Sequence, residues 1–181
     1  MELMDSSHLA WHLSGGTTEL LLVEPKDGNV ICTRIGGTSD ISAGQLIDRT
    51  GQLLSLPFPA GKHLDQLSVD ASDKELFKVK CQGLEFSLSG VQNKVWQYYE
   101  RTGNACETTG YALRCVSYAV MKATENALRQ YPGYRVVFSG GVASNSMLRK
   151  QLARFDPVFC PSQYSTDNAL GVAVLAHRLQ R

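Results

Sequence analysis

The chain opens with three apolar stretches separated by short polar turns. These stretches are rich in leucine, isoleucine and valine and lie at residues 9–13, 18–24 and 29–35. Gly15 and Gly16 separate the first two, and Asp27 and Gly28 lie before the third; turns of both kinds connect antiparallel strands. The pattern predicts a three-stranded meander, which the glycines at 36–37 end.

Longer segments with apolar residues at helical spacing follow the meander. The clearest spans residues 108–130, where small and apolar side chains recur every three or four positions. Further helices are expected at residues 40–54, 63–68, 145–154 and 167–179, and from Ser87 or Ser89 to about residue 100. Thr38 or Ser39 is the expected N-cap of the first of these. Residues 70–85 carry no pattern that assigns them.

Two more strands are expected late in the chain, at residues 136–139 and 157–160. The order is thus a meander, several helices, then strand, helix, strand and helix. This order indicates an α/β fold, the ribonuclease-H-like half of the actin, Hsp70 and sugar-kinase superfamily, with parallel strands beside the antiparallel meander and helices on both faces. With 43% apolar residues in 181, we expect one domain over residues 1–181.

Composition and charge narrow the class of protein. The 18 basic and 17 acidic residues give a net charge of +1, so no general field attracts DNA or a membrane, and any RNA contact is local. No apolar run approaches the roughly 18 residues that span a bilayer, and the first residues lack the features of a signal peptide, so a cytoplasmic protein is expected. The five cysteines are widely spaced, which favours reduced and mostly buried thiols.

Two Ser-Gly-Gly motifs are the first candidates for a binding site. In the second motif, Gly140 and Gly141 connect an apolar strand to the helix that Asn145 opens. Glycines let a ligand approach the backbone closely, and Asn145 is placed to cap the helix or to contact that ligand. An ordinary structural turn would account for the same residues.

The first motif, Ser14-Gly15-Gly16, is followed by Thr17 and Thr18. A turn of this kind offers backbone N–H groups and two hydroxyls, which suit the oxygens of a phosphate. Asp48, on the helix expected over residues 40–54, is a hydrogen-bond acceptor that suits ribose hydroxyls. The alternatives are an ordinary hairpin turn and an ordinary surface acid.

His8 and His12 have the i, i+4 spacing of a helical metal motif. On a helix such side chains lie about 6 Å apart, but this stretch is predicted to be extended, where four residues span about 13 Å. We therefore expect no metal site there. Instead, we expect a frayed, exposed His8 and a His12 at the end of a strand.

Six blocks in order resemble those of the Gcp/TsaD family, formerly called O-sialoglycoprotein endopeptidases or glycoproteases. They lie at residues 13–16, 40–48, 56–61, 86–90, 139–149 and 165–168. The resemblance is to the C-terminal half of that family. Its members bind ATP and help to place a threonylcarbamoyl group on N6 of adenosine 37 in tRNA, so the resemblance implies a nucleotide-binding lobe of such a transferase.

The resemblance also implies roles for particular residues. The phosphates or the acyl-adenylate would be lined by His12, Leu13, Ser14, Gly15 and Gly16, with Thr17 adjacent. The nucleoside would be contacted by Asp48, Gly61 and Asn145, with Gly140 and Gly141 adjacent. The implied cofactor is ATP or threonylcarbamoyl-AMP. Asp167 would ligate one divalent metal, iron or zinc, that two histidines of the missing N-terminal lobe complete. That lobe, tRNA and a paralogous protein of the same fold are the implied partners.

Three departures from the family pattern keep other functions open. Thr17, Gln45 and Gln92 stand where the family usually has a histidine, a glutamate and a lysine. These changes remove acid–base capacity and a charge that could pair with phosphate. The alternatives to a transferase lobe are a non-catalytic scaffold of the same fold and a small-molecule kinase of the same superfamily. A kinase would need an aspartate base near the phosphate turn, which this stretch lacks, and no protease constellation is present.

Overall fold

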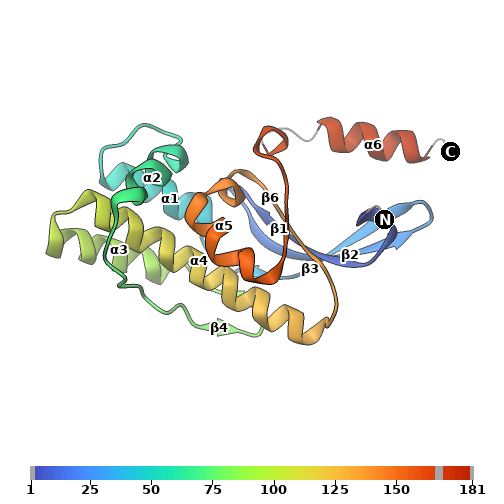
Figure 1. The fold of residues 1–181 in the computed structure, drawn as a ribbon, viewed down its shortest axis with the longest axis horizontal. Helices are drawn as coiled ribbons and strands as arrows, with labels where there is room; N and C mark the ends of the chain where they lie inside the picture. Colours follow the sequence, from blue (N-terminus) through green and yellow to red (C-terminus); the bar gives the residue numbers. More distant parts are fainter. Residues whose placement is uncertain (1–2, 166–168, 180–181) are drawn as a thin grey trace.

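The computed structural model describes residues 3–165 and 169–179, which build a mixed sheet of seven strands (Figure 1). The strand order is β4-β5-β3-β2-β1-β6-β7. The strands are β1 (His8–Leu13), β2 (Thr18–Lys26), β3 (Asn29–Thr38), β4 (Cys81–Gln82), β5 (Glu85–Phe86), β6 (Val136–Ser139) and β7 (Val158–Phe159).

The predicted meander is confirmed, since β1, β2 and β3 pair in antiparallel fashion in chain order. On its other side β1 pairs in parallel with β6, and β6 pairs in parallel with β7. The sheet therefore combines antiparallel and parallel pairs, as the α/β prediction requires. Because β1 and β6 run in the same direction, the segments that follow them emerge at the same edge of the sheet.

Strand β3 runs through Gly36 and Gly37, so the prediction that these glycines end it is wrong. A Cβ on Gly36 would lie 2.5 Å from the carbonyl oxygen of Leu84. A Cβ on Gly37, whose φ is 128°, would overlap the carbonyl oxygen of Thr18. The glycines thus allow β3 to approach its neighbours closely. With Thr38 still in the strand, the predicted N-caps Thr38 and Ser39 are also wrong.

Six α-helices are present in the described part of the chain. They are α1 (Ala43–Leu53), α2 (Gly61–Leu67), α3 (Ser89–Thr102), α4 (Ala105–Gln130), α5 (Ser146–Leu152) and α6 (Ala169–Leu179). Ser42 caps α1, where its hydroxyl and the Gln45 side chain form a reciprocal capping box. Neither predicted serine caps α3, whose N-cap is Leu88 and has no side-chain hydrogen bond.

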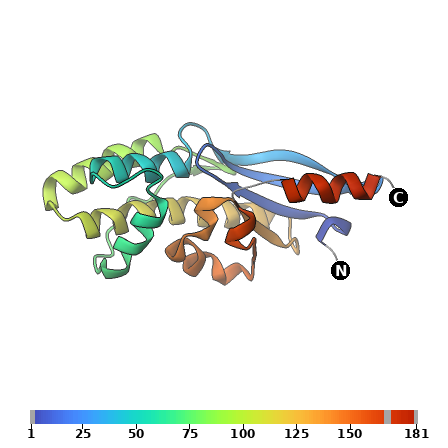
Figure 2. The same cartoon turned by 90° about the horizontal axis from the view of Figure 1, so that it is seen from above.

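The hydrophobic core joins the sheet to helices α1, α3, α4 and α5; in Figure 2, α4 and α5 lie beneath the sheet, and α1 and α3 lie beyond its end. Leu9, Trp11 and Leu13 of β1 are fully buried in it, and α4 crosses it with its apolar face. Trp11 Nε1 donates a hydrogen bond of 2.9 Å to the hydroxyl of Thr124 in α4, so the buried indole N–H is satisfied. This core fixes the strands and helices whose ends form the site below.

Helix α6 lies outside this core, where it contacts β3 (Figure 1). Arg178 of α6 pairs with Asp5 at 2.9 Å. The apolar side chains of α6 remain largely exposed, with Leu170 at 55%, Val172 at 59% and Val174 at 43%. No helix of the described residues is both long and apolar enough to cross a membrane.

Two expectations about the burial of side chains are wrong. His8 is buried rather than frayed, because it pairs with Val23 of β2 and its Nδ1 lies 2.9 Å from the carbonyl oxygen of Ser6. The five cysteines are all unpaired, but Cys115 alone is buried, Cys32 is exposed and the other three are partly buried. Cys32 is exposed because β3 presents much of its length to solvent.

Candidate functional site

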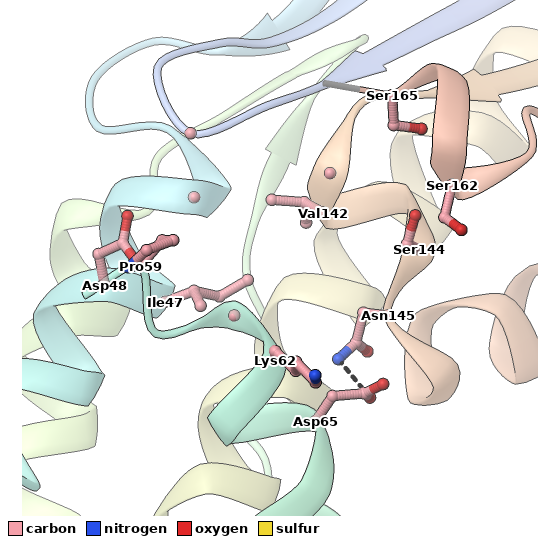
Figure 3. Close-up of a pocket in the computed structure, with 14 residues that line it drawn as sticks. Ile47, Asp48, Pro59, Lys62, Asp65, Val142, Ser144, Asn145, Ser162 and Ser165 are labelled. Atoms are coloured by element: carbon pink, nitrogen blue, oxygen red, sulfur yellow. Dashed lines mark hydrogen bonds between the residues drawn. The ribbon is translucent and has the colours of Figure 1, made fainter. Parts of the chain in front are cut away.

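A pocket of about 630 Å³ lies beyond the carboxyl ends of β1 and β6 (Figure 3). Five separate stretches form its walls: the turn after β1, helix α1, helix α2 with the residues just before it, the segment between β6 and α5, and the segment after β7. Its lining residues are Gly15, Gly44, Ile47, Asp48, Pro59, Gly61, Lys62, Asp65, Gly141, Val142, Ser144, Asn145, Ser162 and Ser165.

The turn at Gly15 is held by hydrogen bonds within it and from α1. Ser14 N donates to the Thr17 carbonyl at 2.9 Å, and Thr17 N donates to the Ser14 hydroxyl at 3.0 Å. The Ser42 hydroxyl donates to the Gly15 carbonyl at 2.6 Å. Thr18, one of the two residues whose hydroxyls suit a phosphate, is buried, and its hydroxyl accepts from Ala43 N at 2.8 Å. The Ser14 and Ser42 hydroxyls therefore support the turn itself, and the Thr18 hydroxyl binds the first residue of α1.

Helix α1 packs directly against the first turn because its own second residue is glycine. A Cβ on Gly44 would overlap the Gly15 Cα, and it would lie 2.5 Å from the Ser14 carbonyl oxygen. One turn further along α1, Asp48 faces the pocket, and its Oδ1 accepts from Ala60 N at 2.9 Å. This bond ties the segment before α2 to α1, so two walls of the pocket meet at Asp48.

The second turn is followed by a short 3₁₀ helix, Gly141–Ser144, and then by α5. Asn145 caps α5 as predicted, since its Oδ1 accepts from Leu148 N at 3.0 Å. Its Nδ2 donates to Asp65 Oδ1 at 2.7 Å, as Figure 3 shows. The same Asp65 oxygen accepts from the N–H and the hydroxyl of Ser146, at 2.9 and 2.8 Å. Asp65 therefore joins α2 to the start of α5.

The pocket brings together five of the residues selected from the sequence: Gly15, Asp48, Gly61, Gly141 and Asn145. It does not include six others, which are His12, Leu13, Ser14, Gly16, Thr17 and Gly140. Asp167 lies outside the described residues. The sequence interpretation did not select the remaining lining side chains, among them Lys62, Asp65, Ser162 and Ser165. Lys62 directly follows Gly61, and Asp65 lies one helical turn beyond it. Their closeness to Gly61 in the sequence was the signal that could have identified them.

His12 is exposed at the end of β1, and its Nδ1 lies 3.5 Å from the Ser139 hydroxyl. His8 and His12 both lie in strand β1. The argument against a His8–His12 metal site depends on this extended conformation. Across residues 3–165 and 169–179, no group of three or more His, Cys, Asp or Glu side chains is placed to hold a metal ion. The described residues alone therefore do not fit a metal centre.

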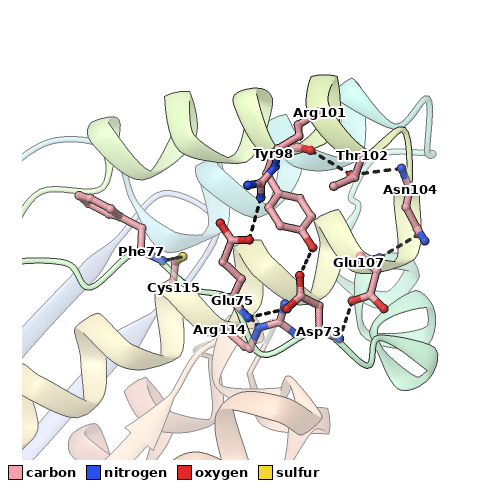
Figure 4. A network of polar contacts seen from close by, with 10 residues as sticks. All are labelled: Asp73, Glu75, Phe77, Tyr98, Arg101, Thr102, Asn104, Glu107, Arg114 and Cys115. Atoms are coloured by element: carbon pink, nitrogen blue, oxygen red, sulfur yellow. Dashed lines mark hydrogen bonds and ion pairs between the residues drawn. The ribbon is translucent and has the colours of Figure 1, made fainter.

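A second polar cluster holds the extended residues 71–80 against α3 and α4 (Figure 4), and its residues are not among those that line the pocket. The Tyr98 hydroxyl donates to Asp73 at 2.5 Å, and Arg101 pairs with Glu75 at 2.7 Å. The hydrogen bond from Tyr98 lowers the pKa of Asp73, while burial, followed by that bond, raises the pKa of Tyr98 to about 12. This cluster explains the stretch without an assignable pattern, because its contacts come from distant residues.

Asp40 has the same supporting character at the start of α3. Partial burial raises the pKa of Asp40, but hydrogen bonds from the Ser87 and Ser89 hydroxyls and from the Leu88 and Ser89 N–H groups outweigh it and lower the pKa to about 2. Asp40 thus takes the place of a local cap for α3. Asp40 and Asp73, whose pKa values are lowered, therefore both connect segments of the fold that are distant in sequence.

Comparison with known proteins gives consistent relatives. A family model described as TsaD, tRNA N6-adenosine threonylcarbamoyltransferase, matches residues 2–174. Proteins of that name from Streptococcus suis (strain 05ZYH33) and Streptococcus equi subsp. zooepidemicus (strain MGCS10565) are 34% and 33% identical. Each comparison covers 93% of this chain and 53% of the relative, so the chain spans about half the length of the curated relatives it matches.

Among solved structures, the crystal structure of T. kodakarensis HypF is similar, with a TM-score of 0.55 and 16% sequence identity. The match covers 72% of this chain and 18% of that chain. At this identity the similarity shows the fold alone, and it is consistent with the α/β architecture described above.

Proposed function

Because this chain belongs to the family of tRNA N6-adenosine threonylcarbamoyltransferases, we propose that its 630 Å³ pocket is one half of an adenine-nucleotide site. One observation carries the proposal. Gly15, Asp48, Gly61 and Asn145, which lie far apart in the sequence, line a single pocket at the carboxyl ends of two parallel strands. Open α/β sheets commonly bind ligands beyond the carboxyl ends of their strands.

The proposed ligand is ATP or threonylcarbamoyl-AMP, and each wall has its own part in holding it. A Cβ on Gly15, Gly61 or Gly141 would meet nothing within 4 Å, so their backbones leave room for close approach by a ligand. Asp48 supplies an acceptor for ribose hydroxyls, and Asn145 supplies a side-chain amide for the nucleoside. These groups bind and orient the nucleotide, which is the part of the reaction that we assign to this chain.

In the proposed reaction the N6 amine of the tRNA adenosine attacks the carbamoyl carbon of threonylcarbamoyl-AMP. A C–N bond forms, the bond from that carbon to the phosphate oxygen breaks, AMP leaves and the amine loses a proton. The pocket contributes by fixing the AMP portion so that the carbamoyl carbon has a defined position. A metal would stabilise developing negative charge on oxygen, but the described residues do not form its site, and we assign no step to it.

A non-catalytic scaffold is the second candidate, and the contacts of two substituted residues favour it. Gln45 completes the capping box of α1, and Gln92 accepts a hydrogen bond of 2.6 Å from Arg49. Both therefore support structure where the family usually has a charged side chain. The described lining residues also include no histidine or cysteine that could move a proton near pH 7.

We further propose that residues 1–181 form one lobe of a two-lobed protein and that another polypeptide segment completes the site. The curated relatives are about twice as long as this chain. Helix α6 also exposes Leu170, Val172 and Val174, and a helix that is apolar on all sides is normally covered. tRNA and a paralogous protein of the same fold are the further proposed partners.

Calorimetric titration of the 181-residue chain with adenosine, AMP and ATP tests the binding proposal. We expect binding weaker than about 1 μM, because a single lobe supplies half of the contacts. Gly61→Ala should weaken it, since the added methyl group projects into open space at the pocket. Gly90→Ala is the matched control: Gly90 also lies in the first turn of a helix with nothing within 4 Å, but it does not line the pocket.

Two results would contradict this proposal. Sub-micromolar affinity of the chain alone would contradict the half-site, and equal effects of Gly61→Ala and Gly90→Ala would contradict the location. Complementation of a strain that lacks the tRNA modification, with the second lobe supplied, then separates the two candidate functions. Restored modification supports the transferase, whereas retained nucleotide binding without restoration supports the scaffold.

A further inference from the structure

Arg149, in the second turn of α5, contacts two of the segments that line the pocket without lining it itself. Its Nε donates to the carbonyl of Ala143 at 2.9 Å, and its Nη2 donates to the carbonyl of Cys160 at 3.1 Å. Its guanidinium carbon lies 4.8 Å from the centre of the Phe159 ring. One side chain therefore bridges two stretches of backbone that are distant in sequence.

Both stretches lead directly into the pocket. Ala143 belongs to the 3₁₀ helix Gly141–Ser144, whose Gly141, Val142 and Ser144 line one wall. Cys160 directly precedes the segment that carries Ser162 and Ser165, which line the wall beside it. The distance between these two walls is consequently set in part by the span of the Arg149 guanidinium.

The wall after Cys160 has few other attachments. Within the described residues, the hydrogen bonds of Pro161–Ser165 are internal: Tyr164 N and the Ser165 hydroxyl donate to the Pro161 carbonyl, and Ser165 N donates to that of Ser162. The segment is fixed at Cys160, whose N–H donates to Phe138 of β6 at 2.8 Å and whose carbonyl accepts from Arg149. Strand β7 before it is two residues long. Arg149 is thus a main attachment of this wall.

We propose that Arg149 is a positioning residue, which sets the separation of the two pocket walls and thereby the affinity for a nucleotide. The inference rests on the proposed function of the pocket. Arginine is suited to this role because its planar guanidinium holds several N–H donors in fixed directions while it stacks on an aromatic ring. A lysine at the same position keeps the charge, but its three N–H donors radiate from one nitrogen, so they do not match the separate positions of Nε and Nη2, and it loses the planar stack on Phe159.

The test compares Arg149→Lys with Arg101→Lys in the full chain. Arg101 is the matched control, because it also lies over an aromatic ring, at 5.1 Å from the centre of Tyr98, and makes a charged hydrogen bond, but it belongs to the cluster that does not line the pocket. Affinity for AMP is measured by calorimetry, well below the melting temperature of each variant. Amide hydrogen exchange is followed over residues 160–165.

We expect Arg149→Lys to weaken AMP binding roughly tenfold, as loss of one hydrogen bond does, and to accelerate exchange over residues 160–165. Arg101→Lys should change neither quantity, even where it lowers the melting temperature as much. Unchanged AMP affinity in Arg149→Lys overturns the inference, whatever the exchange shows. If the unmodified chain binds no AMP even when the second lobe is supplied, the proposed function fails, and unchanged exchange in Arg149→Lys then separately shows that Arg149 does not hold this wall.

Discussion

The two Ser-Gly-Gly turns lie side by side at the carboxyl ends of β1 and β6, yet their glycines serve different purposes. A Cβ on Gly140 would overlap the Leu13 carbonyl oxygen, and its φ is 91°, a value that L side chains rarely adopt. A Cβ on Gly15 or Gly16 would meet nothing within 4 Å. Gly140 is therefore required by the contact with the end of β1, whereas the backbone at Gly15 leaves space in the pocket that a ligand can use.

The same Ser-Gly-Gly motif thus has two different roles, which depend on the group that approaches each glycine backbone. At Gly140 the neighbour is the protein itself, namely the end of β1. Gly15 lines the pocket, and so does Gly141, which follows Gly140 in the second turn. Substitutions that add one methyl group separate the two roles, because they cost stability in one case and ligand affinity in the other.

The largest expected effect is that of Gly140→Ala. The methyl group must displace β1 from β6 and must also adopt an unfavourable backbone conformation, so we expect a loss of roughly 3–5 kcal/mol in the free energy of unfolding. Urea denaturation measures it. Gly141→Ala is the control, since the adjacent glycine has open space around it, and it should lose less than about 1 kcal/mol. Equal losses would show that Gly140 has no requirement beyond that of its neighbour, and the structural role assigned to it would be wrong.

An intermediate effect is expected for Asn145→Ala, just after the second turn. Loss of the N-cap should cost about 1 kcal/mol of unfolding free energy, and loss of the bond to Asp65 should also weaken nucleotide binding. Asn104→Ala is the matched control, because Asn104 caps α4 through the same bond, to Glu107 N at 3.1 Å, and does not line the pocket. Stability is measured by denaturation and affinity by titration with AMP. A loss of affinity in both variants would assign the effect to general destabilisation.

The smallest effect on stability is expected at the first turn. Gly15→Ala and Gly16→Ala should leave the free energy of unfolding unchanged or raise it by up to about 1 kcal/mol, since alanine restricts the unfolded chain. Only Gly15 lines the pocket, so Gly15→Ala should weaken AMP binding on the order of tenfold while Gly16→Ala does not. Titration calorimetry of the two variants measures this affinity. Weaker AMP binding by Gly16→Ala, with unchanged binding by Gly15→Ala, would show that Gly16 rather than Gly15 lines the pocket.

The parts of the fold that follow from local signals could be predicted from the sequence. The turns at Gly15-Gly16 and Asp27-Gly28 identify the meander, the spacing of small and apolar residues identifies α4, and Asn145 was predicted as a cap. In each case the residue and the structure it determines lie within a few positions of each other. The pocket residues Gly15, Asp48, Gly61, Gly141 and Asn145 were accessible because they accompany such signals or lie in the family blocks.

The remaining features depend on contacts between distant residues, which leave no local pattern. Gly36 and Gly37 resemble strand breakers, but their purpose is the close approach of Thr18 and Leu84. The cap of α3 is supplied by Asp40, 48 positions before Leu88, and residues 71–80 are held by α3 and α4. Asp65 was missed for the same reason, because its role appears only when α2 lies beside α5.

The parallel pairing of β1 with β6 has a consequence for the time at which the protein can fold. The Ser139 hydroxyl donates a hydrogen bond to the Trp11 carbonyl across 128 positions, so the edge of β1 that β6 covers stays open until β6 has been synthesised. At ordinary translation rates this takes roughly 6 to 25 s. Throughout that interval the nascent meander presents an unpaired edge rich in leucine, which is a site for pairing with other chains. We therefore expect the yield of folded protein in cells to depend on ribosome-associated chaperones more strongly than its final stability suggests.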